Sequence, residues 1–188
     1  MSEPILTVAN LLTILRMGLA PFLVILILSG RYGWAFGMFV VAALSDLLDG
    51  AIARWGRQRT KLGATLDPVA DKILLSSAFV VLTWGGNLLV SIPAWLTVLS
   101  LLRDAIIVFS VAVINLVLGA RVFEPSLLGK LSTASQLLTV GVVILLNALG
   151  RDLAALEVLF QLTGLLVVAS GMHYVYLVSA HGGNRRNG

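Results

Sequence analysis

Residues 46–71 read DLLDGAIARWGRQRTKLGATLDPVAD, and this stretch places four aspartates in an otherwise apolar chain. Asp46 and Asp49 precede a short basic segment, and Asp67 and Asp71 follow it. A carboxylate within hydrocarbon costs about 2.5–3.5 kcal/mol on insertion scales, so it is kept only where an interaction offsets that cost. Residues three or four apart share one face of a helix, and each pair is therefore predicted to project from a single helical face.

The whole chain has the composition of an integral membrane protein. Of its 188 residues, 59% are hydrophobic and 12% are charged, whereas a soluble domain carries about 25% charged residues. It contains no cysteine, which excludes a disulfide framework, a thiolate metal site and a cysteine nucleophile. The N-terminus lacks a basic region and a cleavage site of small residues, so the first apolar stretch is expected to be a retained helix.

Six apolar stretches are long enough to cross a bilayer, which takes about 20 helical residues. They run from Leu11 to Leu28, Trp34 to Arg54, Leu62 to Trp84, Ile92 to Leu118, Leu127 to Leu149 and Leu153 to Ser179. Glycine-containing turns separate several of them, at Ser29-Gly30, at Gly85-Gly86-Asn87 and at Gly150. The predicted fold class is all-α, a polytopic membrane protein with six transmembrane helices. Residues 1–181 are expected to form one membrane domain, and residues 182–188 a disordered cytoplasmic tail.

Lysine and arginine are unevenly divided between the two sides of this predicted bundle. One side carries only Arg31 and Arg151. The other carries Arg54, Arg57, Arg59, Lys61, Arg121, Arg185 and Arg186. Cytoplasmic loops are enriched in these residues, so the basic side, with both termini, is expected to face the cytoplasm. Because the charge is scattered over three loops, we expect attraction to anionic lipids and no binding of nucleic acid.

The two acid-bearing helices are predicted to be antiparallel neighbours, because only residues 55–62 connect them. Four carboxylates brought together repel one another unless cations lie between them. Oxygen ligands select hard ions such as Mg²⁺, Mn²⁺ or Ca²⁺ over zinc, and two such ions can clamp a phosphoryl group during its displacement. Gly50, Ala53 and Gly63 would leave room for a ligand there, although small residues also simply allow close helix packing.

Ion pairing and ion transport each account for only part of the acidic pattern. Ion pairs with Arg54, Lys72 and the loop bases explain neither the spacing nor the depth of the four acids. Ion transport also uses carboxylates within membranes. The four acids gather at one membrane face, however, and only Asp152 and Glu157 lie near the other. Three functions stay open from the residues: metal-dependent phosphoryl transfer, ion transport and a catalytically silent membrane scaffold.

The pattern D-x-x-D-G-x-x-A-R-x8-G-x-x-x-D-x-x-x-D is met at every fixed position of residues 46–71. It resembles the signature of the CDP-alcohol phosphatidyltransferases. The similarity extends to NLLTILR at residues 10–16, LDPVADK at 66–72, RD at 103–104 and GKLSTA at 129–134. Ala9 stands where relatives often have proline, which alters the entry to the first helix and leaves the chemistry unchanged.

This resemblance implies a homodimer of six-helix subunits in a bacterial inner membrane, with an active site open to the cytoplasm. CDP-diacylglycerol would donate its phosphatidyl group to an alcohol with release of CMP. Two divalent cations, Mg²⁺ or Mn²⁺, would be held by Asp46, Asp49, Asp67 and Asp71. Asp71 would also be the catalytic base that takes the proton from the acceptor hydroxyl. The implied CDP-binding residues are Asn10, Thr13, Gly50, Ala53, Arg54 and Gly63.

Arg103 and Lys130 are the predicted acceptor-binding residues. Arg103 lies near the middle of the fourth apolar stretch, and Lys130 near the start of the fifth. Adjacent residues do not face each other on a helix, so Arg103 is expected not to pair with Asp104. A buried arginine without that partner is predicted to meet a phosphate, which suits its planar fork. An ion pair with another acid of the bundle is the alternative.

The residues around these two suggest which alcohol is used. Relatives that use glycerol 3-phosphate often carry a second arginine and a second lysine where this chain has Val111 and Ser132. A phosphomonoester dianion needs several cationic donors. The run from Lys130 to Gln136 resembles the eukaryotic-type cardiolipin synthases instead, which use phosphatidylglycerol. Phosphatidylglycerol is therefore the preferred acceptor and glycerol 3-phosphate the alternative, with inositol-type and amino-alcohol acceptors behind them.

Overall fold

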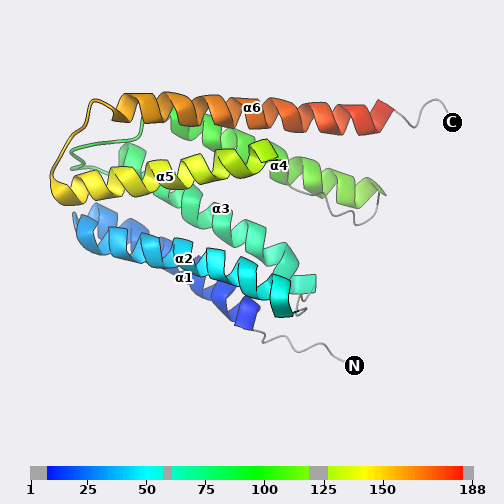
Figure 1. The fold of residues 1–188 in the computed structure, drawn as a ribbon, viewed down its shortest axis with the longest axis horizontal. Coiled ribbons are helices and arrows are strands. Elements are labelled where there is room, and N and C mark those ends of the chain that lie inside the picture. Colours follow the sequence, from blue (N-terminus) through cyan, green and yellow to red (C-terminus); the bar gives the residue numbers. More distant parts are fainter. Residues whose placement is uncertain (1–7, 57–60, 119–126, 184–188) are drawn as a thin grey trace. The chain divides into compact units, whose positions relative to one another are not determined.

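A computed structural model describes the backbone of residues 8–56, 61–118 and 127–183, and the side chains of residues 18–45, 72–109 and 127–176. Across these ranges the chain forms six α-helices and no strand (Figure 1). The helices are α1 (Val8–Leu28), α2 (Tyr32–Gly56), α3 (Lys61–Trp84), α4 (Ala94–Leu118), α5 (Leu127–Leu149) and α6 (Leu156–Gly183). The all-α prediction is confirmed.

Most helix boundaries lie within three residues of the predicted ones. The exception is α6, which continues to Gly183, two residues into the segment expected to be a tail. Helix α4 begins directly after Pro93, whose carbonyl accepts hydrogen bonds from the Leu96 and Thr97 amides. Residues 184–188 lie outside the described range, so the predicted tail stays a prediction for them, as does the single membrane domain.

Glycine ends α1 and α5 in the same way. Gly30 follows α1 with φ of 68°, a conformation that favours a residue without Cβ. Its amide bonds to the Ile27 carbonyl at 3.0 Å, and the Arg31 amide reaches back to the Leu26 carbonyl at 2.9 Å. The same bonding pattern recurs at Gly150, with φ of 61°. Both glycines stand at predicted turns, and the first makes α1 and α2 antiparallel neighbours.

The contacts divide the chain into two compact units. Unit 1 comprises Met1–Ser91 and Val140–Asp152, and unit 2 comprises Ile92–Thr139 and Leu153–Gly188. Helix α5 contributes its first half to unit 2 and its second half to unit 1.

In unit 1, α1 packs against both α2 and α3. The apolar core includes Leu23, Ile27, Phe79 and Leu82, all nearly inaccessible to solvent. On α5, a Cβ added at Gly141 would lie 3.3 Å from a ring carbon of the buried Phe39, so glycine admits that ring.

In unit 2, α4 packs against α6. A Cβ added at Gly164 would lie 2.6 Å from the Trp95 ring, so glycine permits that approach of the two helices. The Thr139 and Thr163 hydroxyls join α5 to α6 by a hydrogen bond of 2.8 Å.

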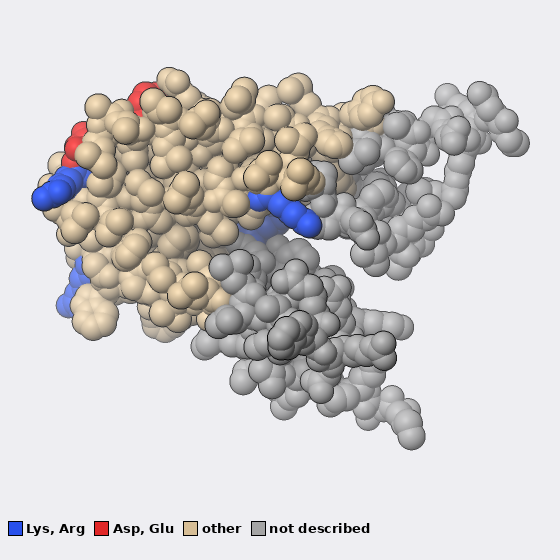
Figure 2. Space-filling view, viewed as in Figure 1, with Lys and Arg blue, Asp and Glu red and all other residues tan. Residues whose placement is uncertain are grey.

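Large apolar side chains cover much of the described surface. In the space-filling view, uncharged residues form nearly all of the described face, with acidic and basic side chains at a few places (Figure 2). Trp34, Phe109, Leu165 and Tyr176 are each more than 60% exposed. By length and composition, two helical stretches in the described ranges could cross a membrane, Leu127–Leu149 and Leu156–Tyr176. The predicted six spans and the cytoplasmic termini stay predictions.

Candidate functional site

The four motif aspartates lie at similar distances from the helix ends that the short connection joins. Asp46 and Asp49 lie on α2, which ends at Gly56, and Asp67 and Asp71 lie on α3, which begins at Lys61. At 1.5 Å per residue, Asp49 and Asp67 are about 9–11 Å from those helix ends, and Asp46 and Asp71 about 15 Å. The ends themselves are at most about 19 Å apart, because five Cα steps join them.

The first turns of α1 belong to the same end of unit 1. Helix α1 runs antiparallel to α2 across the turn at Gly30 (Figure 1). The N-terminal residues of α1, which include Asn10 and Thr13, therefore lie at the same end of unit 1 as the C-terminus of α2. The other predicted CDP-binding residues, Gly50, Ala53, Arg54 and Gly63, are helical residues within two turns of the connection between α2 and α3. The backbone thus gathers these positions at one end of unit 1.

The side chains of residues 1–17 and 46–71 lie outside the described range. Their metal, catalytic and CDP-binding roles therefore stay predictions. No group of three or more histidine, aspartate or glutamate side chains able to hold a metal occurs within the side-chain ranges that are described. The motif positions still fit hard divalent ions, because two helices deliver four carboxylates and oxygen is the donor that Mg²⁺ and Mn²⁺ take.

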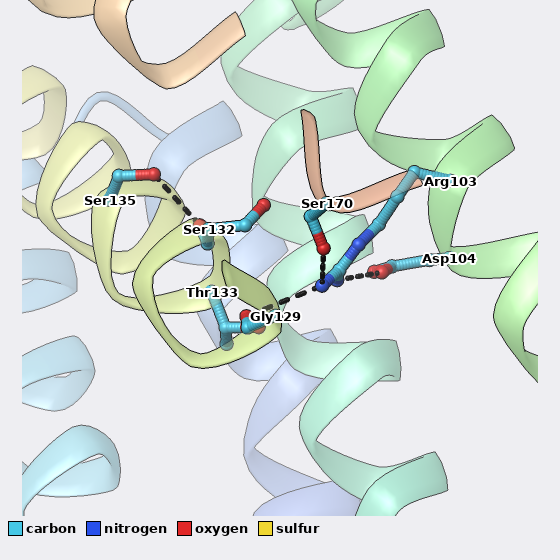
Figure 3. A network of polar contacts seen from close by, with 7 residues as sticks. All are labelled: Arg103, Asp104, Gly129, Ser132, Thr133, Ser135 and Ser170. Carbon is cyan, nitrogen blue, oxygen red and sulfur yellow. Dashed lines mark hydrogen bonds and ion pairs between the residues drawn. The ribbon is translucent and has the colours of Figure 1, made fainter. Parts of the chain in front are cut away.

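Arg103 is the centre of a buried polar network in unit 2 (Figure 3). Its side chain is 7% exposed, and its Nη1 donates to Asp104 Oδ1 at 2.7 Å in a buried ion pair. Its Nη2 donates to the Gly129 carbonyl at 3.3 Å and to Ser170 Oγ at 3.0 Å. Arg103 therefore links α4 to α5 and α6.

The prediction that Arg103 would not pair with Asp104 is wrong. Adjacent residues point about 100° apart on a helix, but the long arginine stem lets the guanidinium swing round to the neighbouring carboxylate. Both side chains are held within unit 2, where burial favours pairing of opposite charges. The acceptor-binding role of Arg103 stays a prediction, without the argument that first supported it.

Lys130, the other predicted acceptor-binding residue, lies in the first turn of α5 and is exposed. It is one residue from Gly129, whose carbonyl accepts from Arg103. The structure therefore brings the α5 segment that carries Lys130 to the Arg103 guanidinium. Binding of an acceptor by Lys130 stays a prediction.

The sequence analysis used Ser132 and Gln136 only to compare possible acceptors and assigned neither of them a place in the site. Ser132 and Gln136 on α5 are at most 1% exposed. The Ser132 hydroxyl and both polar atoms of the Gln136 amide are buried without a hydrogen-bond partner among the described residues. Ser132, Gln136 and Thr139 stand at i, i+4 and i+7 in an apolar helix, and this polar stripe was the signal available in the sequence.

The sequence is similar to known phospholipid-synthesising proteins. A family model described as CDP-alcohol phosphatidyltransferase matches residues 6–173. The human protein named cardiolipin synthase (CMP-forming) is 34% identical over 90% of this chain and 61% of its own length. The rat protein of the same name is 33% identical with the same coverage.

A second kind of relative is similar at the same level. A Mycobacterium tuberculosis protein named probable phosphatidylglycerophosphate synthase is 36% identical over 91% of this chain and 81% of its own length. This chain thus spans about three fifths of the length of the animal relatives and most of the mycobacterial one. Identity alone does not separate the two names.

Proposed function

Because this chain belongs to the CDP-alcohol phosphatidyltransferase family, we propose that it transfers a phosphatidyl group from CDP-diacylglycerol to an alcohol, with release of CMP. The observation that carries the proposal is the aspartate motif, complete at every fixed position and borne by two consecutive helices. Neither ion transport nor a silent scaffold accounts for a complete motif of this length.

We assign the metal site to Asp46, Asp49, Asp67 and Asp71. Two divalent cations bound there would neutralise phosphoryl oxygens and make CMP a better leaving group. The chain's own part is to hold the donor: Gly50, Ala53 and Gly63 leave space for cytidine, Arg54 binds the diphosphate, and Asn10 and Thr13 bind the nucleotide end. The Asp71 carboxylate takes the proton from the acceptor hydroxyl as that oxygen attacks the phosphorus.

We propose phosphatidylglycerol as the acceptor, which would make the product cardiolipin. The Arg103–Asp104 ion pair supports this choice. Arg103 is already paired with Asp104, whereas a phosphomonoester dianion such as glycerol 3-phosphate needs several uncommitted cations. The phosphodiester of phosphatidylglycerol carries one charge and needs fewer. Val111 and Ser132, where further cations would be expected for glycerol 3-phosphate, agree with this assignment.

Glycerol 3-phosphate is the second candidate acceptor. It is favoured by the mycobacterial relative named as a phosphatidylglycerophosphate synthase, because that protein is covered over 81% of its length. Exposed Lys130 would then supply one of the cations for the phosphate.

We also propose the membrane setting. Six transmembrane helices would place both termini and the active site at the cytoplasmic face of a bacterial inner membrane, as a homodimer. The excess of lysine and arginine in the loops of one side supports this orientation. The exposed apolar side chains of α1, α4 and α6 support a lipid-facing surface.

The experiment that tests the function is CMP release from CDP-diacylglycerol by the purified chain in detergent–lipid micelles containing Mg²⁺. Phosphatidylglycerol and glycerol 3-phosphate are supplied in parallel reactions. Asp67→Ala is the matched blank, with an expected loss of at least about 100-fold because one metal ligand is removed. Chelation of the divalent cation is expected to abolish release in the unchanged protein.

The acceptor reactions separate the two candidates. Release with phosphatidylglycerol alone supports cardiolipin synthesis, and release with glycerol 3-phosphate alone overturns that assignment while leaving the metal site intact. Release that persists in Asp67→Ala contradicts the proposed metal ligands. No release with any alcohol contradicts phosphatidyl transfer itself.

A further inference from the structure

Unit 2 contains a cluster of buried polar atoms that have no hydrogen-bond partner among the described residues. They are Ser100 Oγ and Arg103 Nε on α4, and Ser132 Oγ, Gln136 Oε1 and Gln136 Nε2 on α5. Gln136 is 1% exposed, Ser132 is 0% and Ser100 is 4%. We call these four residues the polar seam.

The members of the polar seam lie at neighbouring levels of two helices. Ser100 is one turn before Arg103 on α4, and Ser132 and Gln136 are one turn apart on α5. The first half of α5 belongs to unit 2 with α4 (Figure 1), and Arg103 contacts Gly129, one turn before Ser132 and Thr133. In the close view, the Ser132 side chain points toward Arg103 and Ser170 (Figure 3). The seam members on α5, Ser132 and Gln136, lie about 6 Å apart along the helix axis.

Unsatisfied buried polar groups are rare, because each loses its hydrogen bonds to water and gains none. Several other hydroxyl groups of unit 2 avoid this loss. Thr139 and Thr163 bond to each other at 2.8 Å, and Ser135 Oγ donates to the Ser132 carbonyl at 2.8 Å. The seam therefore differs from these neighbouring hydroxyl groups, and the Tyr174 hydroxyl on α6 is the other buried side-chain atom of unit 2 without a partner among the described residues.

The unused atoms define the chemistry of a matching ligand. The Gln136 amide offers two N–H donors and one carbonyl acceptor, each serine hydroxyl can donate or accept, and Arg103 Nε offers one donor. Adjacent hydroxyl groups, which both donate and accept, match the amide and the serines. A phosphate oxygen matches the remaining guanidinium donor. Together these features describe a glycerol group esterified to phosphate.

We propose that Gln136 and Ser132 bind the hydroxyl groups of a glyceryl phosphate, whose phosphate meets the guanidinium of Arg103. The role of this ligand as the acceptor rests on the proposed function, but its binding does not. Phosphatidylglycerol and glycerol 3-phosphate both contain this diol and a phosphate, so the seam selects for the diol. The charged residues near it, Asp104 and Lys130, decide between the lipid and the soluble phosphate.

Binding is measured first, on the full chain in detergent, by ligand-induced shifts of the melting temperature. The probes are dihexanoylphosphatidylglycerol, its analogue with a 3-hydroxypropyl head group that lacks the secondary hydroxyl, and sn-glycerol 3-phosphate. Gln136→Leu removes the amide at similar volume, and Ser132→Ala removes one oxygen without altering packing. Ser135→Ala is the matched control, because its hydroxyl is already bonded locally on the same helix.

The unchanged protein is expected to bind the diol probe at least about tenfold more tightly than the 3-hydroxypropyl analogue, because the analogue leaves the buried amide unpaired. Gln136→Leu should reduce this preference to within about twofold, and Ser132→Ala should reduce it partially. Ser135→Ala should keep it. Without ligand, Gln136→Leu should melt no lower than the unchanged protein, because it removes an unsatisfied amide.

Two results would overturn the site. One is an absence of preference for the diol in the unchanged protein, and the other is an undiminished preference in both Gln136→Leu and Ser132→Ala. In either case the seam holds a buried water only. Tighter binding of sn-glycerol 3-phosphate than of the lipid probe supports the same site, with glycerol 3-phosphate as its ligand.

CMP release by the same variants separates this inference from the proposed function. Diol-selective binding that depends on Gln136, with no CMP release from any alcohol, upholds the site and contradicts the function. The opposite result is CMP release with phosphatidylglycerol in which the ratio of kcat/KM for phosphatidylglycerol to that for the analogue is the same in Gln136→Leu as in the unchanged protein. That result upholds the function and contradicts the site.

Discussion

Helix α5 carries two buried amides, Gln136 and Asn147, in opposite states. Asn147 is 7% exposed, and its Oδ1 accepts from the Leu89 and Val90 amides at 2.9 and 3.3 Å. Its Nδ2 donates to the Val90 and Val143 carbonyls at 2.8 Å each. Gln136 is 1% exposed, yet neither of its polar atoms has a partner among the described residues.

The difference in hydrogen bonding distinguishes an amide with a structural role from an amide that is available to a ligand. A primary amide can donate twice and accept twice, and Asn147 uses all four capacities to fasten the segment between α3 and α4 to α5. No capacity is left there for a ligand. Gln136, three turns earlier on the same helix, has the same donors and acceptor, and none of them is bonded among the described residues. Burial of a polar side chain therefore does not by itself indicate a site; unsatisfied burial does.

The largest expected effect is on the Arg103–Asp104 pair, which like Asn147 is a buried polar group with its partner in place. Asp104→Ala should lower the free energy of unfolding by about 3–5 kcal/mol, because it leaves a buried guanidinium without its counter-charge. Equilibrium unfolding in mixed detergent micelles measures this. A loss below about 1 kcal/mol, the size of an exposed pair, would show that Asp104 does not neutralise Arg103.

The next effect tests the satisfied amide directly. Asn147→Leu should lower the free energy of unfolding by on the order of 3 kcal/mol, because the Leu89 and Val90 backbone groups lose their partner. Gln136→Leu, the same kind of change on the same helix, should cause no loss. The pair of unfolding curves is the measurement, and equal losses in the two variants would erase the distinction between the amides.

The smallest effect concerns the paired hydroxyls of Thr139 and Thr163. Either single change to valine should cost about 0.6 kcal/mol, the average for polar contacts between membrane helices. Thr139 also donates to the Ser135 carbonyl at 2.8 Å, so Thr139→Val is the single change that leaves a hydroxyl, that of Thr163, without this partner. The double change should cost less than the sum, because it removes that hydroxyl as well. A double-mutant cycle in detergent provides the coupling energy. Strict additivity would mean that the two hydroxyls do not bond.

The helices themselves were predictable from the chain. Long apolar stretches interrupted by glycine turns gave α1 and α5 their C-terminal ends at the residues where the structure has them, because Gly30 and Gly150 can adopt positive φ. The aspartate motif placed its acids on α2 and α3 for a similar local reason, since helical spacing depends only on neighbouring residues. The site positions of unit 1 thus follow from periodicity and the short connection between those helices.

The partners of buried polar groups were not predictable in this way. Helical geometry alone argued against the Arg103–Asp104 pair, and only the packing of α4 with α5 and α6 shows where the guanidinium is held. Asn147 and Gln136 likewise look equivalent in the sequence, as two amides of the same apolar helix. Their bonds come from residues far away along the chain, which local spacing cannot identify.

By itself, the sequence determined that this chain is helical, where most of its helices end and which family's acidic motif it carries, because propensity, turn chemistry and spacing are local properties. Only the tertiary structure decided which buried amide finds partners among the described residues and which does not, and that Arg103 is already paired with Asp104. The physical reason is that a hydrogen bond or ion pair between helices depends on which faces meet, and that is a property of the packed chain.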